Sequence, residues 1–84
     1  MFVQLANMEI NIEQELQKFG RRLRELRKKK NLTQIDLELL CGVGHADISR
    51  MENGQKNSEL ITIIKIAMAL EVNIFDMFDY KSHK

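Results

Sequence analysis

The 84-residue chain has no proline and no tryptophan, and it has only one cysteine and four glycines. Proline and glycine are the strongest helix breakers, so the absence of proline and the small number of glycines favour an all-helical fold. One cysteine cannot form an internal disulfide, which favours a reducing compartment. With 44% hydrophobic and 30% charged residues, the composition is that of a globular domain, and the length leaves room for only one.

Long hydrophobic runs are also absent. The longest apolar stretches lie within residues 60–70, where Thr62 and Lys65 interrupt them, so none approaches the roughly 20 residues of a membrane span. A secretory signal begins with basic residues and continues into a long apolar stretch. Residues 1–6 contain no basic group, and no long apolar stretch follows them. We therefore expect a cytoplasmic protein with no membrane association.

The net charge of +1 conceals a segregation of charge. Residues 18–30 hold eight basic side chains and one acidic side chain, a charge of +7, and the rest of the chain has a charge of −6. Such a basic segment suits a polyanionic partner, although a solvated helix face explains it equally well. If the partner is a nucleic acid, we expect Arg22, Lys28 and Lys56 to neutralise phosphates.

The first of five predicted helical segments begins at Ile12, where Asn11 is a suitable N-cap. Gly20 lies inside this helix at a cost in helix propensity, which indicates close packing against it. Asn31 can end the helix in a left-handed conformation. Apolar residues at spacings of three and four form one helical stripe, which consists of Ile12, Leu16, Phe19, Leu23 and Leu26.

The second and third segments are short. Thr33 begins a helix that extends to about Cys41, which we expect to be a small core residue. A turn with two glycines, residues 42–44, separates it from a third helix over about residues 45–53. Two short helices joined in this way after a basic helix suggest a helix-turn-helix over about residues 34–53.

Two further segments complete the chain. Ser58 is predicted to cap a helix over residues 59–70. Asn73, with Asp76 three residues later, is predicted to cap a short helix over residues 74–78. The expected buried stripe of the longer helix is Leu60, Ile63, Ile64, Ala67 and Leu70.

Many landmarks at fixed spacing carry a family resemblance. They are Leu32-Thr33-Gln34, Leu37, Gly42-Val43, Ile48-Ser49-Arg50, Glu52-Asn53-Gly54, Asn57, residues 66–70 and Phe78. With them the sequence resembles the Cro/cI-type helix-turn-helix family, also called XRE-type or lambda-repressor-like. The resemblance implies a compact, all-α, five-helix DNA-binding domain over residues 12–80, in which the second and third helices form the helix-turn-helix. Residues 1–11 would be an N-terminal extension and residues 81–84 a tail.

The resemblance also implies roles for individual residues. The third helix would be the recognition helix, with His45, Ala46 and Arg50 reading bases. Arg27 and Glu52 would form an internal ion pair. Contacts to the DNA backbone would come from Thr33, Gln34, Ser49, Asn53 and Lys56. Two of these roles have independent physical support, because arginine can read guanine with two hydrogen bonds and helix N-termini favour phosphate.

Some residues depart from the family pattern. Glu38 stands where alanine is usual, and Gly44 replaces the usual serine or threonine N-cap of the recognition helix. Asp47 would repel phosphate, although it can accept from cytosine N4, and we interpret it as a helix N-terminal charge that stabilises the fold. Ile35 and Leu39 share one helix face, which makes an apolar partner surface possible.

An excess of apolar residues predicts a homodimer. In the last helix, Ile74 and Phe78 can pack on the domain while Phe75 and Met77 face outward. The alternative is that Phe75 folds back onto the fourth helix. The whole expected interface consists of Ile74, Phe75, Met77, Phe78, Phe2, Val3 and Leu5. A two-fold axis would place two recognition helices about 34 Å apart, which matches a palindromic operator.

The predicted function is therefore sequence-specific binding of double-stranded DNA by a small homodimeric transcriptional regulator, either a repressor or a controller protein. One alternative is an antitoxin that binds both a toxin and its operator. Another is a protein-interaction module of the same fold that has lost DNA binding. We expect no enzyme, no cofactor and no metal site, since the sequence has neither a nucleophilic triad nor a glycine-rich phosphate loop, and His45, His83 and one cysteine make no plausible metal site.

Overall fold

A computed structural model describes residues 10–80 of the chain. Within this range the elements in chain order are the α-helices α2 (Ile12–Lys29), α3 (Gln34–Cys41), α4 (His45–Glu52) and α5 (Leu60–Leu70), followed by the 3-10 helix η1 (Ile74–Phe78). Phe2, Val3, Leu5 and the expected tail lie outside the described residues, as does most of the expected N-terminal extension. None of these helices is long and apolar enough to cross a membrane.

Local capping fixes most of the helix starts. The side chains of Asn11, Thr33 and Asn73 each accept a hydrogen bond from a backbone N–H three residues later, at the starts of α2, α3 and η1. Thr33 and Asn73 form reciprocal capping boxes with aspartates. Asn31 has a φ of 59°, so it is left-handed as predicted.

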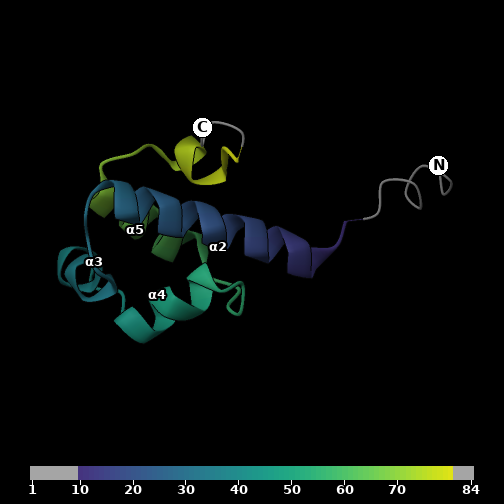
Figure 1. Cartoon of the computed structure of the whole chain (residues 1–84), viewed down its shortest axis with the longest axis horizontal. Coiled ribbons are helices and arrows are strands. Elements are labelled where there is room, and N and C mark those ends of the chain that lie inside the picture. The colour runs from purple at the N-terminus through teal and green to yellow at the C-terminus, as the bar shows by residue number, and fades with distance from the viewer. Residues whose placement is uncertain (1–9, 81–84) are drawn as a thin grey trace, which may run out of the picture.

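The long helix α2 organises the fold. In Figure 1 it runs across the molecule with η1 on one side and α4 on the other, while α3 lies beside one of its ends. Gly20 permits the crossing with α4, because a Cβ atom there would lie 2.4 Å from the backbone oxygen of Met51. The predicted close packing at Gly20 is thus confirmed. The buried core consists of Phe19, Leu23, Leu26, Leu37, Ile48, Met51, Ile66, Ala67, Leu70 and Met77.

Three expectations about the helices are wrong. Glu59, not Ser58, is the N-cap of α5, and the buried Ser58 Oγ has no hydrogen-bond partner within the described range. Leu60 is 61% exposed and Ile66 is fully buried, because α5 is apolar on nearly every side and its pattern does not single out one face. Ile12 is also exposed, since α2 begins beyond the edge of the core.

The fifth predicted segment is a 3-10 helix and not an α-helix, so the described part of the chain has four α-helices. A 3-10 helix has about 3.0 residues per turn, which places residues three apart on one face. Met77 therefore lies on the same face as half-buried Ile74 and is fully buried, whereas Phe75 is 81% exposed. Phe78 is 46% exposed, and its ring packs on that of Phe19, as expected. Met77 was expected at a dimer interface, and its burial in the core contradicts that.

Candidate nucleic-acid interface

Helix α4 has one buried and one exposed face. Ile48 and Met51 are buried in the core, as predicted. His45, Ala46 and Arg50 are exposed on the opposite side. An eight-residue helix with a short polar face of this kind has the form needed to enter the major groove of DNA.

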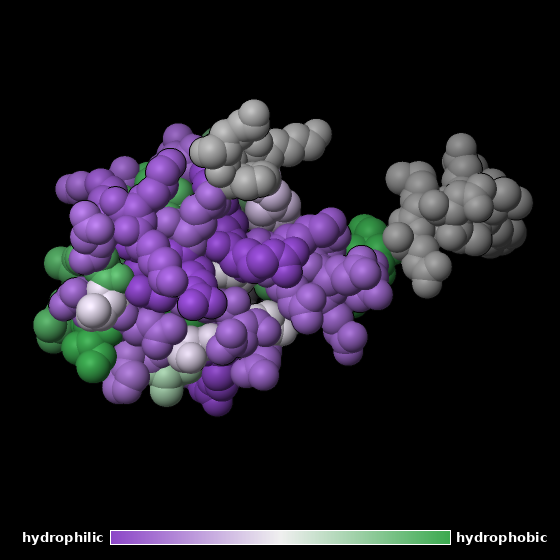
Figure 2. Space-filling model, in the orientation of Figure 1, coloured by the Kyte–Doolittle hydropathy of each residue, from purple (hydrophilic) through white to green (hydrophobic). Residues whose placement is uncertain are grey.

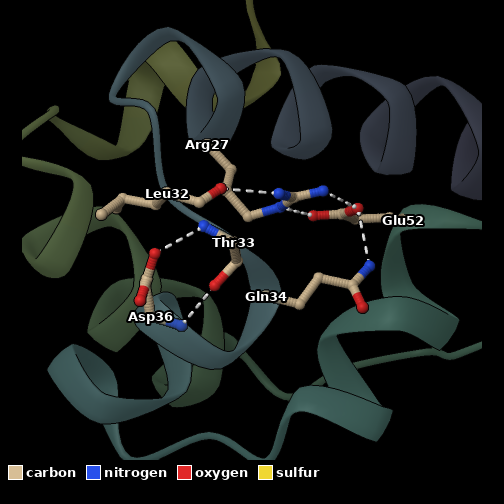
Figure 3. A network of polar contacts seen from close by, with 6 residues as sticks. All are labelled: Arg27, Leu32, Thr33, Gln34, Asp36 and Glu52. Carbon is tan, nitrogen blue, oxygen red and sulfur yellow. Dashed lines mark hydrogen bonds and ion pairs between the residues drawn. The ribbon is translucent and has the colours of Figure 1, made fainter.

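A buried ion pair fixes α4 to α2 (Figure 3). Arg27 Nε donates to Glu52 Oε2 at 2.6 Å, and its Nη2 donates to Glu52 Oε1 at 2.9 Å. The third guanidinium nitrogen, Nη1, donates to the backbone oxygen of Leu32 at 2.7 Å. The hydrogen bond to Glu52 raises the pKa of Arg27. Two parallel charge-assisted bonds give this contact a fixed geometry, so it sets how the end of α4 sits against α2.

Gln34 is part of the same network. Its side-chain amide donates to Glu52 Oε1 at 3.1 Å, so the carboxylate connects α2, α3 and α4. Gln34 is half-buried beside the start of α3, where Thr33 caps the helix. This places Gln34 at a helix N-terminus, where backbone N–H groups favour phosphate. Asn53 is exposed at the end of α4, while Ser49 and Lys56 are half-buried.

The start of α4 is held by a residue that sequence reasoning treated only as a departure from the family pattern. Gly44 is the N-cap and provides no side-chain cap. Instead, Glu38 Oε1 accepts from the backbone N of His45 at 3.1 Å and lies 2.7 Å from its Nδ1. Both hydrogen bonds from His45 lower the pKa of Glu38, and the bond from the side chain has the larger effect.

Asp47 pairs with a candidate base-reading residue. Its carboxylate accepts a hydrogen bond from Arg50 Nη2 on the next turn of α4. The hydrogen bond from Arg50 lowers the pKa of Asp47, and the nearby charge of Lys56 lowers it further by a smaller amount. The interpretation of Asp47 as a helix N-terminal charge therefore omitted its partner. Both side chains are substantially exposed, so water or a ligand can replace the contact.

The basic segment of the sequence divides into two parts in the structure. Arg22 is buried, with Nε donating to the backbone oxygen of Asp76 at 2.8 Å and Nη1 contacting Glu25 at 2.9 Å. The expectation that Arg22 neutralises phosphate is therefore wrong, because the residue attaches α2 to η1. Arg21, Arg24 and Lys28 remain exposed on the outer face of α2.

Exposed apolar residues gather on α3. Ile35, Leu39 and Leu40 are 56%, 79% and 60% exposed, and apolar surface is visible over α3 at the left of Figure 2. The expected exposure of Ile35 and Leu39 is confirmed. Cys41 is half-buried against the core, and its sulfur accepts a hydrogen bond from the backbone N of Val43.

Phe75 does not fold back onto α5, because it is the most exposed large apolar residue of the described range, at 81%. Phe78 is half-covered and its ring centroid lies 5.3 Å from that of Phe19. Two α5 residues, Ile61 and Met68, are also exposed, at 56% and 72%.

Comparisons with known proteins agree with this geometry. The HTH_3 helix-turn-helix family model matches residues 23–77. The restriction-modification controller protein C.AhdI from Aeromonas hydrophila has a similar structure, with a TM-score of 0.74 and 43% identity over 75% of this chain and 96% of that one. Control protein C.BamHI from Bacillus amyloliquefaciens is 36% identical over 63 residues, which cover 74% of this chain and 78% of that protein.

The transcriptional repressor RghR from Bacillus subtilis is 41% identical over 58 residues, which are 68% of this chain. The chain spans less than half the length of the Bacillus subtilis relatives that it matches, and 43% of RghR. Because the family model covers more than half of the chain, this chain belongs to the HTH_3 helix-turn-helix family, also called XRE-type.

Proposed function

We propose that this protein binds double-stranded DNA sequence-specifically as a homodimer and acts as a controller-type transcriptional regulator. The observation that carries the proposal is the geometry of α4, whose buried face is fixed to α2 while His45, Ala46 and Arg50 are exposed. The likeness to C.AhdI, which extends over 96% of that controller protein, favours a controller over other regulators.

In this proposal α4 enters the major groove. Arg50 reads guanine O6 and N7 with two hydrogen bonds, once the duplex has displaced its contact with Asp47. Ala46 provides an apolar contact for a thymine methyl group. Contacts to the DNA backbone come from residues around α4 and from the start of α3, namely Thr33, Gln34, Ser49, Asn53 and Lys56.

A gel shift with duplex DNA from upstream of the protein's own gene tests this function. Because the protein neutralises phosphates and releases counterions, the logarithm of the binding constant should fall steeply and linearly with the logarithm of the salt concentration. Gln34→Ala should weaken binding to this DNA and to random duplex about equally. A binding constant that does not change between low and moderate salt would contradict DNA binding.

The homodimer in the proposal uses the exposed outer face of η1. Phe75 and, in part, Phe78 provide its apolar surface. An isologous contact would cover this surface on both copies. It would also place two α4 helices about one helical turn of DNA apart, roughly 34 Å, as a palindromic operator requires.

Sedimentation equilibrium at micromolar concentration tests the dimer. We expect the wild-type chain to dimerise and Phe75→Glu to be monomeric, because the substitution places charge in the interface. Leu39→Glu is the matched control, since Leu39 is equally exposed, at 79%, but lies on α3. The proposal fails if the wild type is monomeric throughout, or if Phe75→Glu and Leu39→Glu behave alike.

The apolar surface of α3 supports a second candidate, an antitoxin that binds a toxin as well as its operator. Ile35, Leu39 and Leu40 are exposed together on a helix that the dimer proposal does not use. Co-purification of the chain with the product of the neighbouring gene tests this candidate. Leu39→Glu should abolish the association and leave DNA binding intact, and association that survives the substitution would exclude α3 as the surface.

A further inference from the structure

The first residue of α4 makes two contacts with one oxygen atom of α3. Glu38 Oε1 accepts from the backbone N of His45 at 3.1 Å and lies 2.7 Å from the ring nitrogen Nδ1. Gly44, the N-cap position, has no side chain to supply a cap. Glu38 thus satisfies the free N–H of the first residue of α4 and, with the same atom, contacts the imidazole ring.

The chemistry of the carboxylate decides where the ring proton lies. An ionised carboxylate can only accept hydrogen bonds, and the two bonds from His45 lower the pKa of Glu38, so it is ionised at neutral pH. Nδ1 must therefore carry a proton to make the 2.7 Å contact. In a neutral imidazole the other nitrogen, Nε2, is then an acceptor.

Other charged groups near His45 have partners or lie on another helix. Arg27 and Lys28 of α2 line the groove that His45 also lines, and Arg27 is bound by Glu52. On α4 itself, Asp47 and Arg50 bind each other. Glu38 is accordingly the carboxylate that contacts the ring. The His45 side chain is 55% exposed, so a ligand can reach it.

We propose that Glu38 is a positioning residue that fixes His45 in its Nδ1–H tautomer, so that the neutral ring offers Nε2 to DNA as a hydrogen-bond acceptor. The proposal rests on the DNA binding proposed above. In the major groove an acceptor pairs with the amino groups adenine N6 and cytosine N4, whereas Arg50 is a donor suited to guanine. His45 and Arg50 then select opposite kinds of base edge from one helix.

A double substitution separates the tautomer from simple capping. Gly44 has a φ of −59° and a ψ of 141°, and no atom lies within 4 Å of a Cβ built there. Gly44→Ser therefore supplies a local cap without strain. The Glu38→Ala/Gly44→Ser variant keeps α4 capped and leaves Nδ1 without a carboxylate, while Gly44→Ser alone is the matched control.

The first test is nitrogen NMR of the histidine rings in the full chain at a pH of about 8, where an ordinary imidazole is neutral. His83→Gln assigns the two rings. We expect the Nδ1–H signature for His45 in the wild type and in Gly44→Ser, and its loss in Glu38→Ala/Gly44→Ser. An Nε2–H ring in the wild type, or an Nδ1–H ring in the double variant, would overturn the proposal.

The second test is selection from a pool of random duplexes of about 20 base pairs, the length that two half-sites need. His45→Ala identifies the base position that His45 reads. At that position we expect the wild type and Gly44→Ser to prefer adenine or cytosine, and the double variant to lose the preference by roughly fivefold or more. An unchanged preference would overturn the proposal. If no variant enriches any sequence, the proposed DNA binding fails, while the ring spectra still decide the tautomer.

Discussion

Carboxylates hold both ends of α4, but in opposite surroundings. At the C-terminal end, Glu52 binds Arg27 in a bidentate pair whose side chains are only 3% and 9% exposed. At the N-terminal end, Glu38 binds His45 with side chains that are 38% and 55% exposed. Water competes weakly with the first contact and strongly with the second. The buried contact should therefore contribute much more to the stability of the fold than the exposed one.

Breaking the buried end should have the largest effect. Glu52→Gln leaves the Arg27 charge uncompensated in a buried site, and we expect it to lower the free energy of unfolding by about 3 kcal/mol. Denaturant unfolding measures the loss. Because Arg27→Met removes the stranded charge, the double variant Arg27→Met/Glu52→Gln should recover part of it. Additive losses in this double-mutant cycle would show that the two residues do not interact.

Displacing α4 from α2 should have the next largest effect. Gly20→Ala places a Cβ atom 2.4 Å from the backbone oxygen of Met51, and backbone cannot move aside as a flexible side chain can. We expect a loss of about 1–3 kcal/mol in the free energy of unfolding. Gly44→Ser is the control, because its Cβ has open space, and it should be neutral or stabilising. Equal stability of the two variants would contradict close packing at Gly20.

A substitution on the exposed face of α4 should change the affinity for DNA and not the stability of the fold. Asp47→Asn removes the charge that binds Arg50 and repels phosphate. We expect affinity for any duplex to rise several-fold, with a midpoint of unfolding close to that of the wild type. Fluorescence anisotropy with random and upstream duplexes measures the change. Weaker binding of both duplexes would mean that Asp47 itself contacts DNA, for example at cytosine N4.

The smallest effect is expected from acid at the exposed end. The lowered pKa of Glu38 means that its contribution to stability is present above the ordinary value near 4.5 and is lost as the pH falls below it. The difference in melting temperature between the wild type and Glu38→Ala should therefore shrink between neutral pH and strongly acid pH. A constant difference across this range would show that ionised Glu38 does not stabilise the fold.

Features that depend on neighbours in sequence could be predicted. The caps at Asn11, Thr33 and Asn73 each involve a backbone N–H three residues away, and the left-handed Asn31 follows from its own side chain. The burial of Ile48 and Met51 follows from helical periodicity. These predictions succeeded because the physical cause lies within one or two turns of chain.

Features that depend on tertiary contacts could not be predicted in the same way. Glu38 reaches His45 across the turn between α3 and α4, seven residues away, so no local pattern marks it as a cap. Nothing in the sequence distinguishes Arg22 from an exposed basic residue, because its burial depends on a contact with η1. Met77 was predicted on the wrong face because a 3-10 helix has fewer residues per turn than an α-helix. A segment of five residues is too short for its apolar pattern to distinguish the two periods.

The proposed function depends most on α4 as the surface that reads DNA sequence. The most direct test compares wild type and Arg50→Ala for the ratio of affinity between upstream duplex and random duplex at one fixed salt concentration. We expect Arg50→Ala to lower this ratio by the equivalent of roughly 1–3 kcal/mol, because a bidentate base contact is lost. If the ratio stays the same while the protein remains folded, α4 does not read the sequence through Arg50.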